Sequence, residues 1–294
     1  MKKLIVFVII IFSLAMAATY YPWQQTEETE SVLEKKTIAK QDNYLKIPEA
    51  NKKTIIKYPV PETTVESEGE RTGELAAVEQ EPAANTASPD PVVPEAPKPL
   101  PQLDESDRDV ADAINRLTDV TGLFSFKNFI RHFVVTIDNL TNQKIPQRYI
   151  FTQRVPDKFA VVTKDVDTAL LDTRNFIRYA GFVNLAERID TGKLVAHYVR
   201  FYPLFQEAYE ELGYPDRYFN DRLIQVIDHL LDAPEVEGQI NLVRPKVFYQ
   251  FANPELEALS AGQKILVRVG VDNAQRVKAK LRELRTVLTT LPLQ

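Results

Sequence analysis

Eight aromatic residues fall within the 25 residues from Tyr198 to Arg222, where they alternate with arginine, glutamine, asparagine and aspartate side chains. This mixture is typical of protein recognition surfaces and of sites that stack sugar rings. The alternative is a tyrosine-rich core whose hydroxyl groups reach its rim. If the segment binds a partner, some of its tyrosines and arginines are expected to be exposed together beside a groove, the candidates being Arg200, Tyr202, Tyr209, Tyr214, Arg217, Tyr218 and Arg222. Gln206 and Asn220 could supply directional hydrogen bonds.

Carboxylates in the same region could carry a different chemistry. Glu207 and Asp221 could act as the acid and base of a hydrolase if burial separated their pKa values, although solvated carboxylates on helix faces are the simpler explanation. Asp228, His229 and Asp232 have a spacing that could hold a metal ion, but an ion-paired helix face explains it more simply. The chain has no cysteine and no phosphate-loop, dinucleotide, zinc-protease or serine-hydrolase motif. We therefore predict no catalytic residue, cofactor or metal site.

Helices must position the aromatic segment. Apolar residues recur at helical spacing from Lys193 to Leu212, and Pro203 inside this helix predicts a kink near residue 199. Leu204, Phe205 and Leu212 are expected in its core. A further helix over residues 218–231 is expected to be capped by Asp216.

Short strands and breaks complete the expected architecture. Residues 159–171 and 240–251 have the composition of two hairpins, and Gly181 is expected to break a helix. Asn253 and Pro254 predict the start of one helix that continues to Gly270. The fold class is mainly α with minor β (α+β): a helical bundle-like C-terminal domain over residues 104–294 with one or two short hairpins.

The first residues suggest a membrane anchor. No residue from Leu4 to Pro22 is charged, Lys2 and Lys3 precede this run, and aromatic residues end it at Trp23. A helix of this length spans roughly 28 Å, close to the hydrocarbon thickness of a bilayer. A signal peptide cleaved after residue 17 is the alternative, because Ala15 and Ala17 suit a cleavage site. Either interpretation exports the rest of the chain.

Residues 24–103 have the composition of a disordered, Pro/Glu-rich linker. They contain no phenylalanine and carry most of the chain's net charge of −5, whereas residues 104–294 carry only −1. A short apolar stretch from Thr54 to Val60 could add a strand to a partner, although a slightly sticky piece of linker is the simpler explanation. The acidic balance argues against a nucleic-acid partner.

Several short motifs resemble a bacterial, membrane-anchored family of unknown function (domain of unknown function 3014). They run from Asn128 to Arg131, Val135 to Leu140, Tyr202 to Gly213, Phe219 to Arg222, Val226 to Leu231 and Leu259 to Lys264. The resemblance covers about Leu100 to Leu288 and is weak between Gln143 and Asp190. It implies an envelope protein with an N-terminal hydrophobic segment, a proline-rich spacer and this domain. It offers no activity, substrate or site residue.

These observations predict a single-pass inner-membrane protein with a periplasmic C-terminal domain, anchored through Leu4 to Trp23. The expected function is non-enzymatic, because a tether raises the local concentration of a binding module near the membrane. Its expected partner is an envelope protein or a cell-wall component. The alternative is an envelope hydrolase that acts on cell-wall glycan or peptide through carboxylates such as Glu207 and Asp221.

Overall fold

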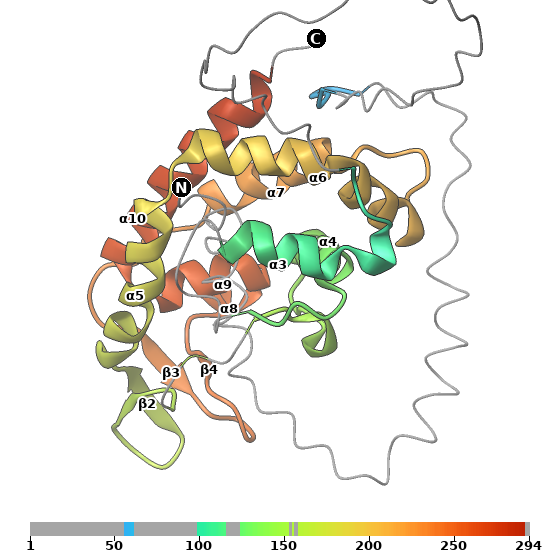
Figure 1. Cartoon of the computed structure of the whole chain (residues 1–294). Helices are drawn as coiled ribbons and strands as arrows, with labels where there is room; N and C mark the ends of the chain where they lie inside the picture. The colour runs from blue at the N-terminus through green and yellow to red at the C-terminus, as the bar shows by residue number, and fades with distance from the viewer. Residues whose placement is uncertain (1–55, 62–98, 116–123, 153–154, 156–157, 292–294) are drawn as a thin grey trace, which may run out of the picture.

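A computed structural model describes residues 56–61, 99–115, 124–152, 155 and 158–291. Within these residues the protein is mainly helical, with a small antiparallel sheet, as the sequence predicted. Figure 1 shows the helices packed together and the sheet at one end of the molecule, below α5. The described α-helices are α3 (Asp107–Asn115), α4 (Phe129–Asn139), α5 (Arg174–Arg188), α6 (Thr191–Glu211), α7 (Phe219–Leu231), α8 (Pro254–Ala258), α9 (Ala261–Arg268) and α10 (Val271–Thr289).

Both predicted hairpins are confirmed, and they join into one sheet. The strands are β1 (Val161–Thr163), β2 (Thr168–Leu171), β3 (Asn241–Val243) and β4 (Gln250–Phe251), in the order β1-β2-β3-β4. All neighbours are antiparallel, and β2 pairs with β3 through Ala169 opposite Leu242. Alternate residues of these strands bury a small apolar cluster that includes Leu171, Leu242 and Phe251.

The main core lies between the helices. One face of α4 supplies fully buried side chains at helical spacing, among them Phe129, Phe133 and Ile137. Helix α4 packs against α6 and α7, and α10 packs against α5, α6 and α7. The aromatic rings of Phe133, Phe205 and Phe219 meet where α4, α6 and α7 converge.

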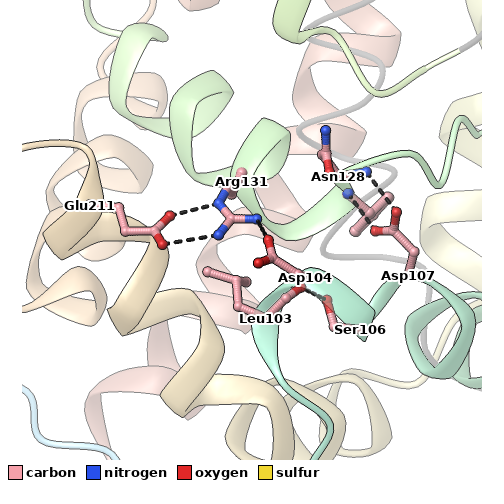
Figure 2. Close-up of polar contacts among 8 residues, drawn as sticks. Leu103, Asp104, Ser106, Asp107, Asn128, Arg131 and Glu211 are labelled. Atoms are coloured by element: carbon pink, nitrogen blue, oxygen red, sulfur yellow. Dashed lines mark hydrogen bonds and ion pairs between the residues drawn. The ribbon is translucent and has the colours of Figure 1, made fainter.

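A carboxylate from a neighbouring helix caps the start of α4. Asn128 has a left-handed backbone (φ 51°) and makes no side-chain cap of its own. Asp107 at the start of α3 instead accepts the N–H groups of Asn128 and Phe129 at 2.7 and 2.9 Å, as Figure 2 shows. This contact satisfies donors that a helix start leaves free and fixes α3 against α4.

An ion-paired arginine joins three elements beside that cap. Arg131 on α4 donates two hydrogen bonds to Glu211 at the end of α6 and one to Asp104 in the 3-10 turn Leu103–Glu105 (Figure 2). The Arg131–Glu211 hydrogen bonds raise the pKa of Arg131 and lower the pKa of Glu211. This bidentate contact holds the carboxyl end of α6 over α4.

Three local predictions were wrong. Helix α5 continues through Gly181, where a side chain would meet open space, because the residues on either side bury one apolar face. Residues 254–268 form two helices rather than one, since the Ser260 hydroxyl accepts the N–H of Gln263 and starts α9. Leu212 was expected in the core, but it follows the last turn of α6 and is 37% exposed.

Helix α6 runs unbroken over 21 residues with Pro203 inside it. Pro203 is exposed, so its ring faces away from the core. Leu204 and Phe205 are buried, as predicted.

No helix among the described residues combines the length and apolar composition needed to cross a bilayer. The anchor expected from Leu4 to Trp23 lies outside those residues, as does most of the linker expected over residues 24–103. Residues 56–61 of that linker are described. We call them the docked segment, because they lie against α7 (the short blue trace in Figure 1).

Candidate functional site

The junction between α6 and α7 is organised by one glutamine. Gln206 on α6 accepts the N–H of Phe219 and the hydroxyl of Tyr202 with Oε1, at 2.9 and 3.1 Å. Its Nε2 donates to the carbonyl of Arg217 and to Glu210. Gln206 therefore caps α7 in the role that the sequence had assigned to Asp216.

Asn220, in the first turn of α7, is fully buried and fixed by two tyrosines. The Tyr198 hydroxyl donates to Oδ1 of Asn220 at 3.1 Å, and the backbone N–H of Asn220 donates to the Tyr202 hydroxyl at 3.3 Å. These contacts leave the side-chain NH2 group of Asn220 pointing outward, where it donates to the backbone carbonyl of Tyr58 at 2.8 Å.

Two further side chains, one directly before α7 and one in its first turn, hold the main chain of the docked segment. The carboxylate of Asp221 accepts the backbone N–H groups of Lys57 and Tyr58 at 2.9 and 2.8 Å, one on each oxygen. The Tyr218 hydroxyl accepts the N–H of Val60 at 2.8 Å. We call Tyr218, Asn220 and Asp221 together the 218–221 site. It binds four main-chain groups of a segment more than 150 residues away in sequence.

The docked segment also buries side chains. Val60 is only 6% exposed and belongs to the main core, and Tyr58 packs against that core while half-buried. The segment forms no strand pairing, since its described main-chain contacts are to side chains of α7. Addition of a strand to a partner, considered for Thr54 to Val60, stays a prediction, because no partner is present and residues 54 and 55 lie outside the described residues.

A cleft of about 470 Å³ opens beside the docked segment. The segment contributes Lys57 and Tyr58 to its wall, and α7 contributes Asp221, Gln225 and Asp228. Tyr209 and Arg217 line it as well, whereas Glu207 and Arg200 do not. The cleft thus extends the 218–221 site along α7 toward its carboxyl end.

The remaining arginines and tyrosines form a second cluster around Asp138 of α4. Arg222 pairs with Asp138 at 2.8 Å, with both side chains largely buried, and the Tyr214 hydroxyl reaches the other oxygen of Asp138. Tyr214 stacks on Tyr209, and Arg217 lies over the Tyr214 ring at 5.3 Å. Arg222 and Tyr214 therefore join α4 to α7. Arg217 and Arg222 both line the cleft, and Arg217 is the exposed one of the two.

Burial keeps the tyrosines of the site neutral. Desolvation raises the pKa of Tyr198 and of Tyr202 well above the ordinary value, and it raises the pKa of Tyr209 to about 12. At physiological pH these hydroxyl groups therefore remain protonated, so the Tyr198 hydroxyl is available to donate to Asn220.

The structure changes the exposure expected for two of the predicted binding residues. Tyr202 and Tyr209 are only 7% and 1% exposed, so both are core residues, and Tyr202 acts by orienting Gln206 and Asn220. Arg200 is half-buried over the ring of Phe201 and lies outside the cleft wall. Gln206, Tyr218 and Asn220 meet at the α6–α7 junction, and Tyr209, Tyr214, Arg217 and Arg222 gather beside it.

Two parts of the site were missed by sequence reasoning. Asp221 was considered only as an acid or base, and the segment from Thr54 to Val60 was judged a piece of linker. The available signal was local, since Tyr58, Pro59, Val60 and Pro61 form an apolar and extended run inside an acidic region.

The carboxylates considered for chemistry do not converge. Glu207 is exposed on α6 and lies outside the cleft that Asp221 lines. Asp228 pairs with Arg285 of α10, whereas His229 shares a hydrogen bond with Ser260 at 2.8 Å. Burial lowers the pKa of His229. Among the described residues no group of three or more potential ligands could hold a metal ion.

A family model described as "Protein of unknown function (DUF3014)" matches residues 129–285, more than half of the chain. This confirms the resemblance to that family of unknown function, whereas the membrane anchor expected with it stays a prediction. No curated protein and no solved structure matches. The matched region contains the 218–221 site but not the docked segment.

Proposed function

The chain belongs to this family of unknown function, and we propose that it is a tethered binding module of the cell envelope that holds an extended polypeptide at the 218–221 site. In this proposal Leu4 to Trp23 anchor the chain in the inner membrane. The C-terminal domain faces the periplasm, and its partner is another envelope protein.

One observation carries the proposal. Three side chains at the start of α7 bind four main-chain groups of one extended segment, with two charge-assisted bonds to Asp221. Main-chain hydrogen bonds supply affinity in peptide recognition, and adjacent side-chain pockets supply specificity. A site of this kind suits a polypeptide better than a sugar, because it offers acceptors to three N–H groups and a donor to one carbonyl, the two groups that a backbone repeats.

The sequence supports the envelope assignment. The uncharged run from Leu4 to Pro22 follows Lys2 and Lys3, the arrangement expected for an N-terminus that stays inside. With residues 56–61 docked, the expected linker between the anchor and the domain shortens to residues 24–55, which still allows the domain to search roughly 30 Å from the membrane while it remains concentrated there.

The two carboxylates named for the hydrolase alternative do not line a common cleft. A carboxylate acid and base must face the same substrate atoms, but Glu207 lies outside the wall of the cleft that Asp221 lines. Both oxygens of Asp221 are already engaged by N–H groups of the docked segment.

Site-specific photo-crosslinking in intact cells tests the proposal. A photoreactive residue replaces Gln225, which is exposed and lines the cleft, in the full-length chain. The matched control places the same residue at Gln275, an exposed glutamine on α10. We expect an envelope protein to crosslink at residue 225 and not at residue 275, and Asp221→Asn to abolish that adduct. Equal crosslinking at both positions, or none at residue 225, would refute the proposed function.

A further inference from the structure

We infer that the docked segment is a ligand held in the same chain. We infer further that the 218–221 site recognises, in its partner, a proline-flanked segment of the Tyr-Pro-Val-Pro type. This inference rests on the proposed function, because it names the chemistry of the polypeptide that would replace residues 56–61. The docked segment and the partner would compete for the same three side chains.

The hydrogen bonds define which ligand positions must carry an N–H group. Asp221 requires donors at two consecutive residues, which are Lys57 and Tyr58 here, and the Tyr218 hydroxyl accepts a third from Val60. The intervening position is Pro59, which has no N–H to leave unsatisfied. A proline is therefore tolerated at position 59. A proline in place of Lys57, Tyr58 or Val60 would remove an N–H group that the site binds.

The prolines also prepare the backbone for binding. Proline disfavours helical geometry at the residue before it, so Pro59 biases Tyr58 toward an extended conformation and Pro61 does the same for Val60. A segment that is already extended loses less conformational entropy when it binds. This gives a short segment useful affinity for the site.

Two side chains add specificity. Val60 enters the main core at 6% exposure, where a charged residue would be buried without a partner. The Tyr58 side chain packs against the main core and lines the cleft. The site therefore selects an aromatic residue, a proline and a small branched apolar residue in this order.

Covalent connection makes the docked segment a strong competitor. A ligand in the same chain acts at an effective concentration on the order of millimolar, so a free segment of equal intrinsic affinity cannot readily displace it. The partner must either bind more tightly or present its segment at high local concentration. Envelope proteins near the same membrane could meet the second condition.

A fluorescent peptide with the sequence of residues 54–62 is the probe, and its anisotropy reports binding to the full-length, detergent-solubilised chain. The chain is used with its native segment, and with the segment released by Tyr58→Ser and Val60→Asp together. We expect saturable binding to the released form and at least about tenfold weaker apparent binding to the native form, because the native segment competes.

Variants of the protein and of the peptide serve as controls for specificity and folding. Asp221→Asn in the released form keeps the shape of the side chain but replaces an acceptor with a donor, and should weaken peptide binding at least about tenfold. Asp216→Asn, at an exposed position just before α7, should leave it unchanged. A peptide carrying Val60→Asp should not bind. Thermal unfolding of each variant must remain cooperative and within a few degrees of the parent.

The outcomes separate the two proposals. Failure of the peptide to bind the released form, or equal binding to the native and released forms, overturns the inference even if the crosslink at residue 225 is found. Peptide binding without any crosslink in cells supports the inference and refutes the proposed partner. Concentration-dependent dimers that Asp221→Asn disrupts would show that the segment comes from a second copy, and would overturn the intramolecular assignment.

Discussion

The side-chain amide of Asn220 donates a hydrogen bond to the backbone carbonyl of Tyr58 across a sequence separation of 162 residues. Asn220 is fully buried, and its Oδ1 is already bound by the Tyr198 hydroxyl. Without the docked segment, the Nδ2 group would need another acceptor, because an unsatisfied buried donor costs about 1–3 kcal/mol. The hydrogen bonding of a buried residue in the helical core therefore depends on residues 56–61.

Docking should protect the Lys57–Tyr58 bond from trypsin. The protease needs an extended, accessible chain, but Asp221 holds the N–H groups on both residues of that bond. Each 1.4 kcal/mol of docking free energy should slow this cleavage about tenfold. We expect Asp221→Asn to accelerate cleavage after Lys57, as measured by mass spectrometry of timed digests.

Cleavage after Arg71, within the expected linker, serves as the internal control of that digest. It should be rapid and equal in both proteins, and it should leave a resistant fragment that begins at Thr72. Because this cut separates the docked segment from the domain, cleavage after Lys57 is compared only in chains that are still intact at Arg71. If cleavage after Lys57 were as fast as cleavage after Arg71 in the native chain, the docked segment would not be held in solution.

Two leucines on the same helical segment should differ sharply in their contribution to stability. Leu204 is 4% exposed, whereas Leu212 is 37% exposed. Leu204→Ala should lower the free energy of unfolding by about 2–5 kcal/mol through lost burial and the cavity left behind. Leu212→Ala should cost less than about 1 kcal/mol. Denaturant unfolding of the two variants checks the comparison, and similar losses would place both residues in the same environment.

Alkaline pH should destabilise the protein through Tyr209. Desolvation raises the pKa of Tyr209 to about 12 in the folded state, against about 10 in an unfolded chain. Below pH 10 both states keep the proton, so stability does not depend on this group. Between about pH 10 and 12 only the unfolded state loses it, and stability falls by about 1.4 kcal/mol per pH unit.

The variant Tyr209→Phe removes that dependence. Its stability relative to the parent should rise steadily above pH 10 in denaturant titrations. The same comparison at pH 8, where Tyr209 is neutral in both states, gives the contribution of the hydroxyl alone. A difference that stays constant from pH 8 to 11 would contradict the assigned pKa.

The proposed anchor predicts a membrane topology. A reporter that is active only outside the cytoplasm should be active when fused after Gln294, because Lys2 and Lys3 keep the N-terminus inside. Carbonate extraction should leave the full-length protein in the membrane fraction. Release by carbonate would instead favour cleavage after Ala17.

The sequence predicted the elements that depend on local patterns. Both hairpins and the helix over Tyr198 follow from apolar periodicity and turn residues. The break before α9 had a signal that was missed, because Ser260 and Gln263 have the spacing of a capping motif. The helical path through Gly181 was missed because packing on the rest of α5 outweighs about 1 kcal/mol of poor helix propensity.

The pairings between distant residues could not be predicted. No sequence pattern near Ala169 indicates that it pairs with Leu242, and none near Lys57 indicates that it contacts Asp221. The first contact joins residues more than 70 positions apart and the second more than 160, and local patterns in a single sequence carry no signal of such distant pairs. The aromatic segment was recognised from composition, but composition could not separate Tyr209 in the core from Arg217 at the rim.

The cap that Asp107 provides to α4 lies outside the region that matches the family model. The family match begins at residue 129, so it excludes Asp107 together with the buried side chains of Leu103 and Ile114. A protein trimmed to the matched region would start with an uncapped helix and an open apolar face. Homology boundaries would thus be poor guides for recombinant expression here, and soluble fragments should start upstream of the 3-10 turn at Leu103–Glu105.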